Sequence, residues 1–591
     1  MKNKWDLTFI YKDEESFKKD LETVKNDYIN KMSSFEGKLK DDKSLKEYLN
    51  LNREVTPILT KLGMFASMRS DLDKKDTKNA TALQEVEYVY SLLNEKLSYV
   101  EPEILSIGKD KIDLFLKNNP DYNDFDYYFD KLFNGAKFVL ANKEEKLVSY
   151  FSQLENEGST LYSQLSVGDY IPKNVTLKSG KEIEVNQANW TSLIPTLDNE
   201  DDRQKVFESL YSYYEEHKNV YGEIYNTVMQ AEVAEKKARG YSSILQAHLF
   251  RNKIPEAVFH NLVDVASTCN AGLKKYLNLR KKYLKLDKYH TYDRFLKLTH
   301  SEKKYTYDEG KELFFKSIEK FPEDFKNKAR EVTKDGYVDV YHSLGKRTGA
   351  YSSGGENVHP FILLNYNDTL EDVFTLAHES GHSIHTLYSM EAQPVVKQGY
   401  TIFVAEIAST FNEHNLLDFL MKSGTLSRND KITLLEKAID EIVATFYRQT
   451  SFGHYEYNIS KMVEEGKPIN HEVLSNEMIK LYKMYYGLDI NEEKVKKYVW
   501  AYIPHLFYTP FYVYQYATSF TASMLIYKNV KNNVPGAFDN YIKMLKSGGS
   551  DYPIEEVKLA GVDLTEKEAF LAVTSYMDEL VDQLEKLLED E

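Results

Sequence analysis

The chain has 591 residues, of which 92 are acidic and 76 are Lys or Arg, so its formal net charge is −16 at pH 7. This balance excludes a general nucleic-acid-binding protein, which needs a basic surface for phosphates, and a protein held on anionic membrane by charge. With 42% hydrophobic and 28% charged residues, the composition is that of a globular chain, and its length predicts at least two lobes.

Signals for other compartments are missing from the sequence. The single cysteine, Cys269, excludes internal disulfides and cysteine-based zinc clusters. The start of the chain lacks the apolar segment of a secretory signal, and no uncharged apolar run reaches membrane-spanning length. We therefore expect a soluble cytoplasmic protein without nucleic-acid or membrane partners, and the sequence does not define its oligomeric state.

Most of the chain has the residue spacing of helices. Residues 14–27 place Phe17, Leu21 and Val24 on one face, and residues 568–587 carry a similar apolar stripe near the other end. Glycine and proline are sparse, at 26 and 14 residues, which suits long helices better than many short strands. The pattern predicts a mainly α-helical fold with two lobes.

A few segments alternate as strands do. Residues 175–185 predict a hairpin that turns at Ser179-Gly180, and residues 337–344 and 359–366 predict two strands. The glycine-rich segment 345–355 between these strands is interpreted as a loop. We therefore expect a small β-sheet beside the segment that follows residue 370.

A polar stretch near residue 198 is the predicted boundary between two domains. The N-terminal helical lobe then covers residues 1–198 and contains the hairpin, and a catalytic domain covers residues 199–591.

The segment His378-Glu379-Ser380-Gly381-His382 is an HExxH motif. On a helix the two histidines lie one turn apart on one face, so both can bind one metal ion, while Glu379 holds a water molecule as general base. With 14 histidines in the chain, the motif is expected by chance roughly 0.03 times. Gly381 costs a helix about 1 kcal/mol relative to alanine, which favours a functional reason for the segment. The motif predicts one zinc ion per chain.

A catalytic zinc usually has a third protein ligand. The metzincin pattern requires a glycine and a third histidine at fixed offsets after HExxH. In this chain those positions are His385 and Tyr388, which excludes the metzincin class. The remaining candidates for the third ligand are Glu391, Glu406 and Glu413. We expect His385 to be packed or to support a ligand.

Glu406 is the predicted third ligand. It lies in the otherwise apolar, helix-like segment 402–413, where a carboxylate needs a partner such as a metal. Glu413 lies two turns further along the same face, and we expect it to orient a ligand imidazole.

These motifs resemble the M3 metallopeptidases, and within them the oligoendopeptidase F group. The resemblance rests on His378–His382 and on Phe403-Val-Ala-Glu-Ile-Ala-Ser-Thr-Phe-Asn-Glu413, and the segments Trp5–Thr8, Ala238–Tyr241 and Gly345–Ser352 are similar to others in that family. It implies a nearly all-helical, two-lobed fold with an oligopeptidase F-type N-terminal lobe. It also implies a zinc ion deep in a channel that admits short unfolded peptides.

The resemblance assigns a second set of residues to the segment 505–516. In the family, a histidine and one or two tyrosines of this region stabilise the oxyanion, for which hydroxyl and imidazole donors are suited. His505 matches the histidine, Tyr508 and Tyr516 are the favoured tyrosines, and Tyr514 is the alternative.

Further residues are predicted to bind substrate. The strand that begins at His359 is expected to be an edge strand that pairs with an extended peptide. The segment from Gly349, including Tyr351, is expected to close over the peptide, and Tyr400 to face the channel. Tyr514 is included as a second possibility for substrate contact.

The leading hypothesis is a zinc-dependent endopeptidase that cleaves oligopeptides, with cobalt or manganese able to replace zinc. The alternative is a zinc carboxypeptidase or dipeptidase, in which Lys346 or Arg347 would hold the terminal carboxylate of the substrate. A peptide-binding protein without chemistry is the third hypothesis, but binding alone has no need of the general base Glu379.

Overall fold

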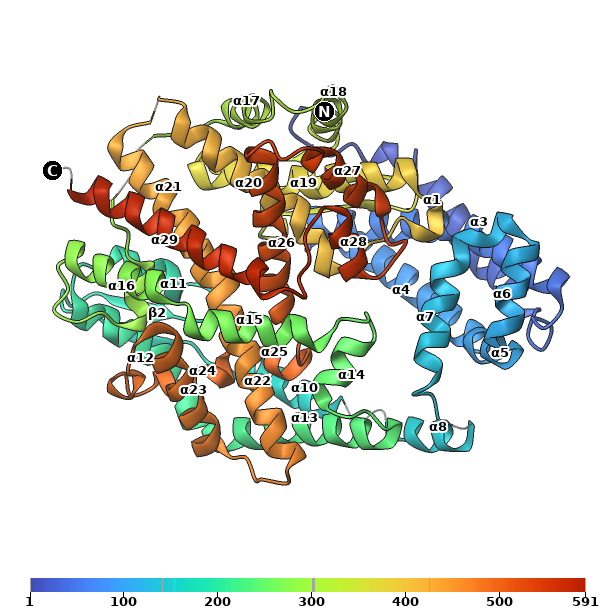
Figure 1. Ribbon diagram of the computed structural model, residues 1–591, viewed down its shortest axis with the longest axis horizontal. Helices are drawn as coiled ribbons and strands as arrows, with labels where there is room; N and C mark the ends of the chain where they lie inside the picture. The colour runs from blue at the N-terminus through green and yellow to red at the C-terminus, as the bar shows by residue number, and fades with distance from the viewer. Residues whose placement is uncertain are drawn as a thin grey trace. The chain divides into compact units, whose positions relative to one another are not determined.

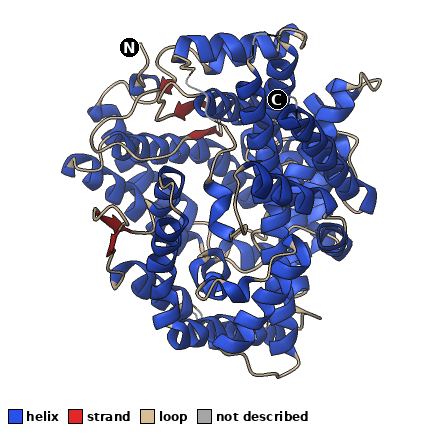
Figure 2. Cartoon of the chain, turned by 90° about the vertical axis from the view of Figure 1, so that its left-hand side faces the viewer, coloured by secondary structure: helices blue, strands red, loops and turns tan. Residues whose placement is uncertain are grey.

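The computed structural model describes residues 2–140, 142–151, 154, 156–299, 303–424 and 426–589. Helices make up most of these residues and the strands are short (Figure 2), which confirms the predicted mainly α-helical class. No helix in these ranges combines the length and the apolar character needed to cross a bilayer. The cytoplasmic location stays a prediction.

The chain forms two compact units, neither of which is continuous in sequence. Unit 1 contains residues 1–137, 303–422 and 523–562, and unit 2 contains residues 138–302, 423–522 and 563–591. The boundary predicted at residue 198 divides the chain once along its sequence, so these discontinuous units do not test it, and it stays a prediction. The substrate channel that the resemblance implies also stays a prediction.

The helices and strands are labelled in chain order in Figure 1. Unit 1 holds α1 (Glu14–Thr23), α2 (Ile29–Ser33), α3 (Asp42–Leu72), α4 (Thr77–Leu97), α5 (Val100–Ile107), α6 (Lys109–Asn118), α7 (Asp126–Ala136), α17 (Tyr307–Ser317), α18 (Glu323–Val332), β3 (Val338–Asp339), β4 (Tyr351–Gly355), β5 (Val358–Leu363), α19 (Leu370–Ala392), α20 (Ile402–Lys422), α27 (Ala537–Ser547) and α28 (Pro553–Leu559). Unit 2 holds α8 (Asn142–Ser149), α10 (Glu157–Ser163), β1 (Lys173–Thr176), β2 (Glu182–Val185), α11 (Trp190–Leu193), α12 (Glu200–Glu216), α13 (Lys218–Arg239), α14 (Ile244–Phe250), α15 (Glu256–Thr268), α16 (Ala271–Tyr283), α21 (Arg428–Glu441), α22 (Arg448–Glu464), α23 (His471–Tyr486), α24 (Val499–Tyr502), α25 (His505–Tyr508) and α29 (Lys567–Glu589). The helix α26 (Tyr514–Lys531) includes residues of both units.

The predicted terminal helices and the hairpin are confirmed. Helix α1 begins after a capping box between Asp13 and Ser16 and buries Phe17 and Leu21, as its apolar spacing requires. Helix α29 covers the predicted C-terminal stripe. Strands β1 and β2 pair antiparallel on either side of the predicted turn.

The predicted strand 337–344 is reduced to the two residues of β3, because only these two pair with β5. The three-stranded sheet of unit 1 also differs from the prediction by one added strand. Its order is β3-β5-β4, with β3 parallel and β4 antiparallel to β5. The segment 345–355 was expected to be a loop, but residues 351–355 form β4, and pairing with β5 explains how a Ser/Gly-rich segment becomes a strand. The predicted edge strand, β5, is therefore the central one, and β4 is an edge.

The N-terminal segment fixes the sheet within the core of unit 1. The indole Nε1 of Trp5 donates a hydrogen bond of 2.8 Å to the carbonyl oxygen of Ile362 in β5. Trp5, Phe361 and Leu363 belong to one buried apolar cluster with residues of α3 and α4. The sheet also contacts α19, the helix that carries the HExxH motif, as predicted.

Candidate metal centre

Two packed helices of unit 1 carry the HExxH motif and the predicted third ligand. Helix α19 begins with a capping box between Thr369 and Asp372, and it runs beside α20. At Gly381 a Cβ atom would lie 2.4 Å from the carbonyl oxygen of Ala408 and 2.7 Å from the Cα of Ser409. The glycine therefore has a packing reason that the sequence did not reveal, because it lets the two helices approach closely.

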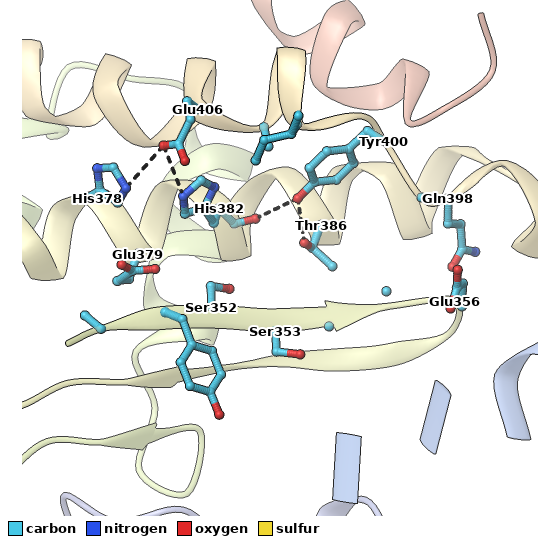
Figure 3. Close-up of a pocket in the computed structure, with 17 residues that line it drawn as sticks. Ser352, Ser353, Glu356, His378, Glu379, His382, Thr386, Gln398, Tyr400 and Glu406 are labelled. Carbon is cyan, nitrogen blue, oxygen red and sulfur yellow. Dashed lines mark hydrogen bonds and ion pairs between the residues drawn. The ribbon is translucent and has the colours of Figure 1, made fainter. Parts of the chain in front are cut away.

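This approach brings together His378, His382 and Glu406 (Figure 3). The Oε2 atom of Glu406 lies 3.4 Å from Nε2 of His378 and 3.5 Å from Nε2 of His382. One ligand atom from each of the three residues lies within 4.8 Å of the other two. The structure thus places the three predicted ligands around one point.

The separations fit a tetrahedral metal ion. Zinc bonds to nitrogen and carboxylate oxygen are about 2.0–2.1 Å long, so neighbouring ligand atoms of a tetrahedron lie roughly 3.3–3.4 Å apart. The two measured separations of 3.4 and 3.5 Å agree with this value. Two imidazoles and a carboxylate are also the donor set of catalytic zinc sites that keep one position open.

Neighbouring groups orient each ligand. The Nδ1 atom of His378 lies 2.5 Å from Oε1 of Glu413, the contact predicted for that glutamate. His382 is hydrogen-bonded to the backbone of Ala405, and Ser409 Oγ donates to Glu406 Oε2 over 2.9 Å. These contacts turn Nε2 of each histidine toward Glu406.

The protein environment sets the charge of the cluster. Burial raises the pKa of Glu406, but hydrogen bonding to His378 and the charges of both histidines outweigh it and hold the pKa at about 2. Burial, and then the charge of His378, lowers the pKa of His382 to about 4. At neutral pH the charged carboxylate of Glu406 therefore faces the neutral imidazole of His382. Burial lowers the pKa of His378, but hydrogen bonds to Glu406 and Glu413 outweigh it and raise this pKa, so a metal ion bound here would displace a proton from His378.

Glu379 lies beside the cluster without being part of it. Its side chain is buried on the side of α19 that faces β4, near Ser352 (Figure 3). Burial raises the pKa of Glu379 to about 7, while a hydrogen bond from the backbone of Ser352 opposes the rise. In the described part of the chain, its Oε2 atom has no hydrogen-bond partner. The position and pKa suit a group that accepts and releases a proton.

A cavity of about 540 Å³ opens on this cluster. Strand β4 forms one wall, α19 and the start of α20 form the other, and Glu356 and Gln398 lie at the end away from His378 (Figure 3). Neither Glu356 nor Gln398 belongs to a sequence motif, so neither was predicted to line the site.

The predicted substrate-binding residues of unit 1 divide into two groups. Tyr351 and Tyr400 line the cavity, whereas Gly349 and His359 do not. Tyr400 stacks on His385 with ring centroids 3.7 Å apart, so His385 is packed and is not a ligand. His359 stacks on Tyr337, with ring centroids 3.8 Å apart.

The rejected ligand candidate Glu391 lies elsewhere. Its Oε2 atom is 2.7 Å from Nζ of Lys328, and it forms no part of the His/Glu cluster.

The remaining predicted residues belong to unit 2. His505 has the rings of Tyr512 and Tyr516 at centroid distances of 6.1 and 6.3 Å. Tyr508 contacts the ring of Tyr162, and Tyr514 is buried. The structure therefore groups His505 with Tyr516, and with Tyr512, which the sequence analysis did not select. The signal available for Tyr512 was its spacing of seven residues from His505.

Comparisons with known proteins identify the family of the chain. The family model "Peptidase family M3" matches residues 195–575, and the model "Oligopeptidase F" matches residues 103–170. The group B oligopeptidase PepB of Streptococcus agalactiae is 32% identical over 99% of this chain and 97% of its own length. The oligopeptidase PepF of Bacillus subtilis is 32% identical over 99% and 87%.

A solved structure extends the similarity to the fold. The crystal structure of oligoendopeptidase F from Enterococcus faecium has a TM-score of 0.76, is 26% identical, and covers 98% of this chain and 99% of its own. This family implies a catalytic metal, and the His/His/Glu cluster is suited to hold one. The chain belongs to peptidase family M3 and is a metallopeptidase.

Proposed function

We propose that the chain is a zinc endopeptidase that hydrolyses internal peptide bonds of short, unfolded oligopeptides. The observation that carries the proposal is the group of His378, His382 and Glu406 at metal-binding distances, with the carboxylate of Glu379 beside it. The resemblance to enzymes named oligopeptidase and oligoendopeptidase supports the substrate class.

His378, His382 and Glu406 would hold the zinc ion, which supplies Lewis acidity and makes water a nucleophile near neutral pH. Glu379 takes a proton from the attacking water and delivers it to the leaving amine, since its buried carboxyl exchanges protons near pH 7. Glu413 keeps the ring of His378 in place through its contact at Nδ1.

Residues of unit 2 are assigned the oxyanion by family resemblance. His505 and a tyrosine would donate hydrogen bonds to the developing negative charge. The grouping of His505 with Tyr516 and Tyr512 supports these two tyrosines over Tyr508, which packs on Tyr162.

The substrate backbone would lie along β4. This strand has a neighbour on one side only among the described strands, and its residues line the cavity beside the cluster. An extended peptide can pair with such an edge through main-chain hydrogen bonds. Such pairing uses the backbone of the substrate and not its side chains, so it suits an enzyme that accepts many peptide sequences.

Cation placement supports internal cleavage over removal of C-terminal residues. The candidate carboxylate-binding residues are both occupied, because Nζ of Lys346 lies 2.6 Å from Oδ1 of Asp339 and Arg347 pairs with Asp71 at 3.4 Å. Of the residues described along the cavity of unit 1, none is lysine or arginine. This wall therefore offers no cation for a terminal carboxylate.

The test is Glu379→Gln, compared with the wild type for zinc content and for cleavage of an internally quenched peptide blocked at both ends. We expect about one zinc per chain in both proteins and a loss of cleavage of at least about 10²-fold in the variant. Glu371→Gln, at the exposed start of the same helix, is the matched control and should cleave normally. Full activity of Glu379→Gln would refute the general base, and wild-type zinc without cleavage would refute the endopeptidase.

A further inference from the structure

Unit 2 contains a cavity of about 560 Å³ whose lining includes none of the residues assigned to the peptidase reaction. Its walls come from α11, from the 3₁₀-helix Thr291–Phe295, from α24, and from the junction of α21 and α22. The lining includes Arg294, Lys297 and Arg448 but a single carboxylate, Asp440. In a chain with a net charge of −16, this concentration of positive charge is unusual.

The two arginines form no ion pair within the described ranges, although Asp440 lines the same cavity. Neither guanidinium forms a side-chain hydrogen bond there, and Nε of Arg448 is buried without an acceptor. Each instead lies on a ring, with Arg294 4.4 Å from the centroid of Phe295 and Arg448 5.4 Å from that of Phe452. Arg294 and Arg448 are partly buried, whereas the fully buried arginines of this unit, Arg203 and Arg280, are paired with Asp293 and Glu436.

A fourth cationic side chain lies next to residues that line the cavity. Lys496 is buried, and its Nζ lies 5.1 Å from the ring centroid of Tyr211 and 5.4 Å from that of Tyr482. Tyr211 packs against Trp190 and Tyr502, which both line the cavity. Lys496 therefore adds a cationic group near the cavity, at a position where burial disfavours its charge.

The cationic side chains lower one another's pKa values. Burial, followed by the charge of Arg448, lowers the pKa of Arg294, and burial and Arg294 lower the pKa of Lys496 far below its usual value. The acidic neighbours have other partners. Glu493 accepts from the backbone N–H of Thr291 at 2.8 Å, and Asp440 accepts from the hydroxyl of Tyr276 at 2.7 Å.

Arginine cannot relieve such an environment by losing its proton, because its pKa remains above the physiological range. Burial of a charge without a partner is unfavourable. Three cationic side chains and one carboxylate leave the lining with an excess of positive charge. An anion in the cavity would provide the missing partner.

We propose that this cavity is a binding site for an anion of the phosphate class, either inorganic phosphate or the phosphate group of a small phosphomonoester. Two guanidinium groups match phosphate oxygens with paired hydrogen bonds. The cavity is larger than one ion and is walled by Trp190, Phe295 and Tyr502, which suits the organic body of a phosphomonoester.

The conformation of the backbone before Arg448 also supports a binding site in this cavity. Residues Ile442–Tyr447 form a π-helical segment between α21 and α22, and Val443 and Ala444 of that segment line the cavity. Such a segment changes the direction of the side chains that follow it and is common at functional sites.

The test is calorimetric titration of the metal-loaded protein with inorganic phosphate at constant ionic strength. Wild type, Arg294→Gln, Arg448→Gln and Arg448→Lys are compared, with Arg251→Gln as the control that removes an exposed arginine of unit 2 outside the cavity. Phosphate that binds the active-site metal would bind all variants alike, so the comparison isolates this cavity. Circular dichroism verifies that each variant is folded, and Arg294→Gln and Arg448→Lys carry the test if Arg448→Gln does not fold.

We expect saturable binding to wild type and to Arg251→Gln, and binding at least tenfold weaker to Arg294→Gln and Arg448→Gln. Arg448→Lys should lie between, because it keeps the charge and loses the paired geometry. A second titration with phenyl phosphate distinguishes the two sources, since tighter binding than inorganic phosphate identifies a phosphomonoester. Absence of saturable phosphate binding, equal binding by the variants, or equal binding of chloride would overturn the proposal.

Discussion

The metal centre of unit 1 and the cation cavity of unit 2 both gather charged side chains away from bulk water, but they treat those charges differently. At the metal centre each carboxylate contacts an imidazole, since Glu406 lies near both histidines and Glu413 contacts His378. In the cavity, Arg294 and Arg448 lie over aromatic rings and form no ion pair in the described part of the chain. A complete set of partners indicates a preorganised site, whereas an incomplete set indicates that a ligand supplies the missing charge.

The largest expected effect tests the contacts between the charged groups of the metal centre. Glu406→Ala should lose metal affinity and kcat/KM by more than about 10²-fold, since even the loss of a supporting contact costs 10–100-fold. Metal analysis after dialysis and peptide cleavage measure both. Glu391→Ala is the matched control, because that glutamate was also a candidate ligand but pairs with Lys328. Equal metal content in the two variants would contradict the assignment of Glu406.

The next effect tests the contact between α19 and α20 that brings the three predicted metal ligands together. Gly381→Ala should destabilise the protein by about 1–3 kcal/mol and weaken metal binding, because its Cβ would overlap the backbone of α20. Gly135→Ala is the control, since a Cβ in that helix meets nothing within 4 Å and should be neutral or stabilising by up to about 1 kcal/mol. Urea unfolding measures both, and equal destabilisation would show that the contact is unimportant.

A further effect, which depends on pH, concerns the buried carboxyl of Glu456 in unit 2. Glu456 accepts the backbone N–H of Phe511 at 2.8 Å, and its other oxygen has no partner in the described part of the chain. Burial raises the pKa of Glu456 to about 8, so it becomes neutral where an arginine cannot. The folded state holds this proton more tightly than the unfolded state, so stability falls as pH rises from about 4.5 to 8.

Glu456→Gln should remove this contribution. The amide can still accept the N–H of Phe511, and it carries no charge to bury. We expect the variant to match the wild type near pH 5 and to exceed it in stability by a few kcal/mol, about 2–4, at pH 8. Thermal unfolding across this range measures the difference. A constant difference at all pH values would contradict an ionisation at this residue.

Most of the metal centre could be predicted from the sequence, because the residues that signal it lie close together in the chain. His378 and His382 lie one helical turn apart, and Glu406 is the acid in an apolar segment shortly after them. The predominance of helices also follows from local spacing, as α1 and α29 show.

What the sequence could not predict depends on contacts between distant segments. Strand β4 has the composition of a loop and exists because β5 pairs with it. Gly381 is unfavourable for the stability of an isolated helix, and the reason for it is the close approach of α20, which local sequence does not reveal. Arg294 and Arg448 come from segments far apart in the chain, and neither belongs to a motif.

The edge position of β4 has a consequence for which peptides survive in contact with this enzyme. A strand that recognises a partner through amide and carbonyl groups tests backbone chemistry, so a proline or an N-methylated residue at the paired positions removes a donor and blocks the alignment. Cyclic peptides that cannot extend would fail in the same way. Resistance to this peptidase would then follow from the shape that a peptide can adopt, largely independent of its side chains.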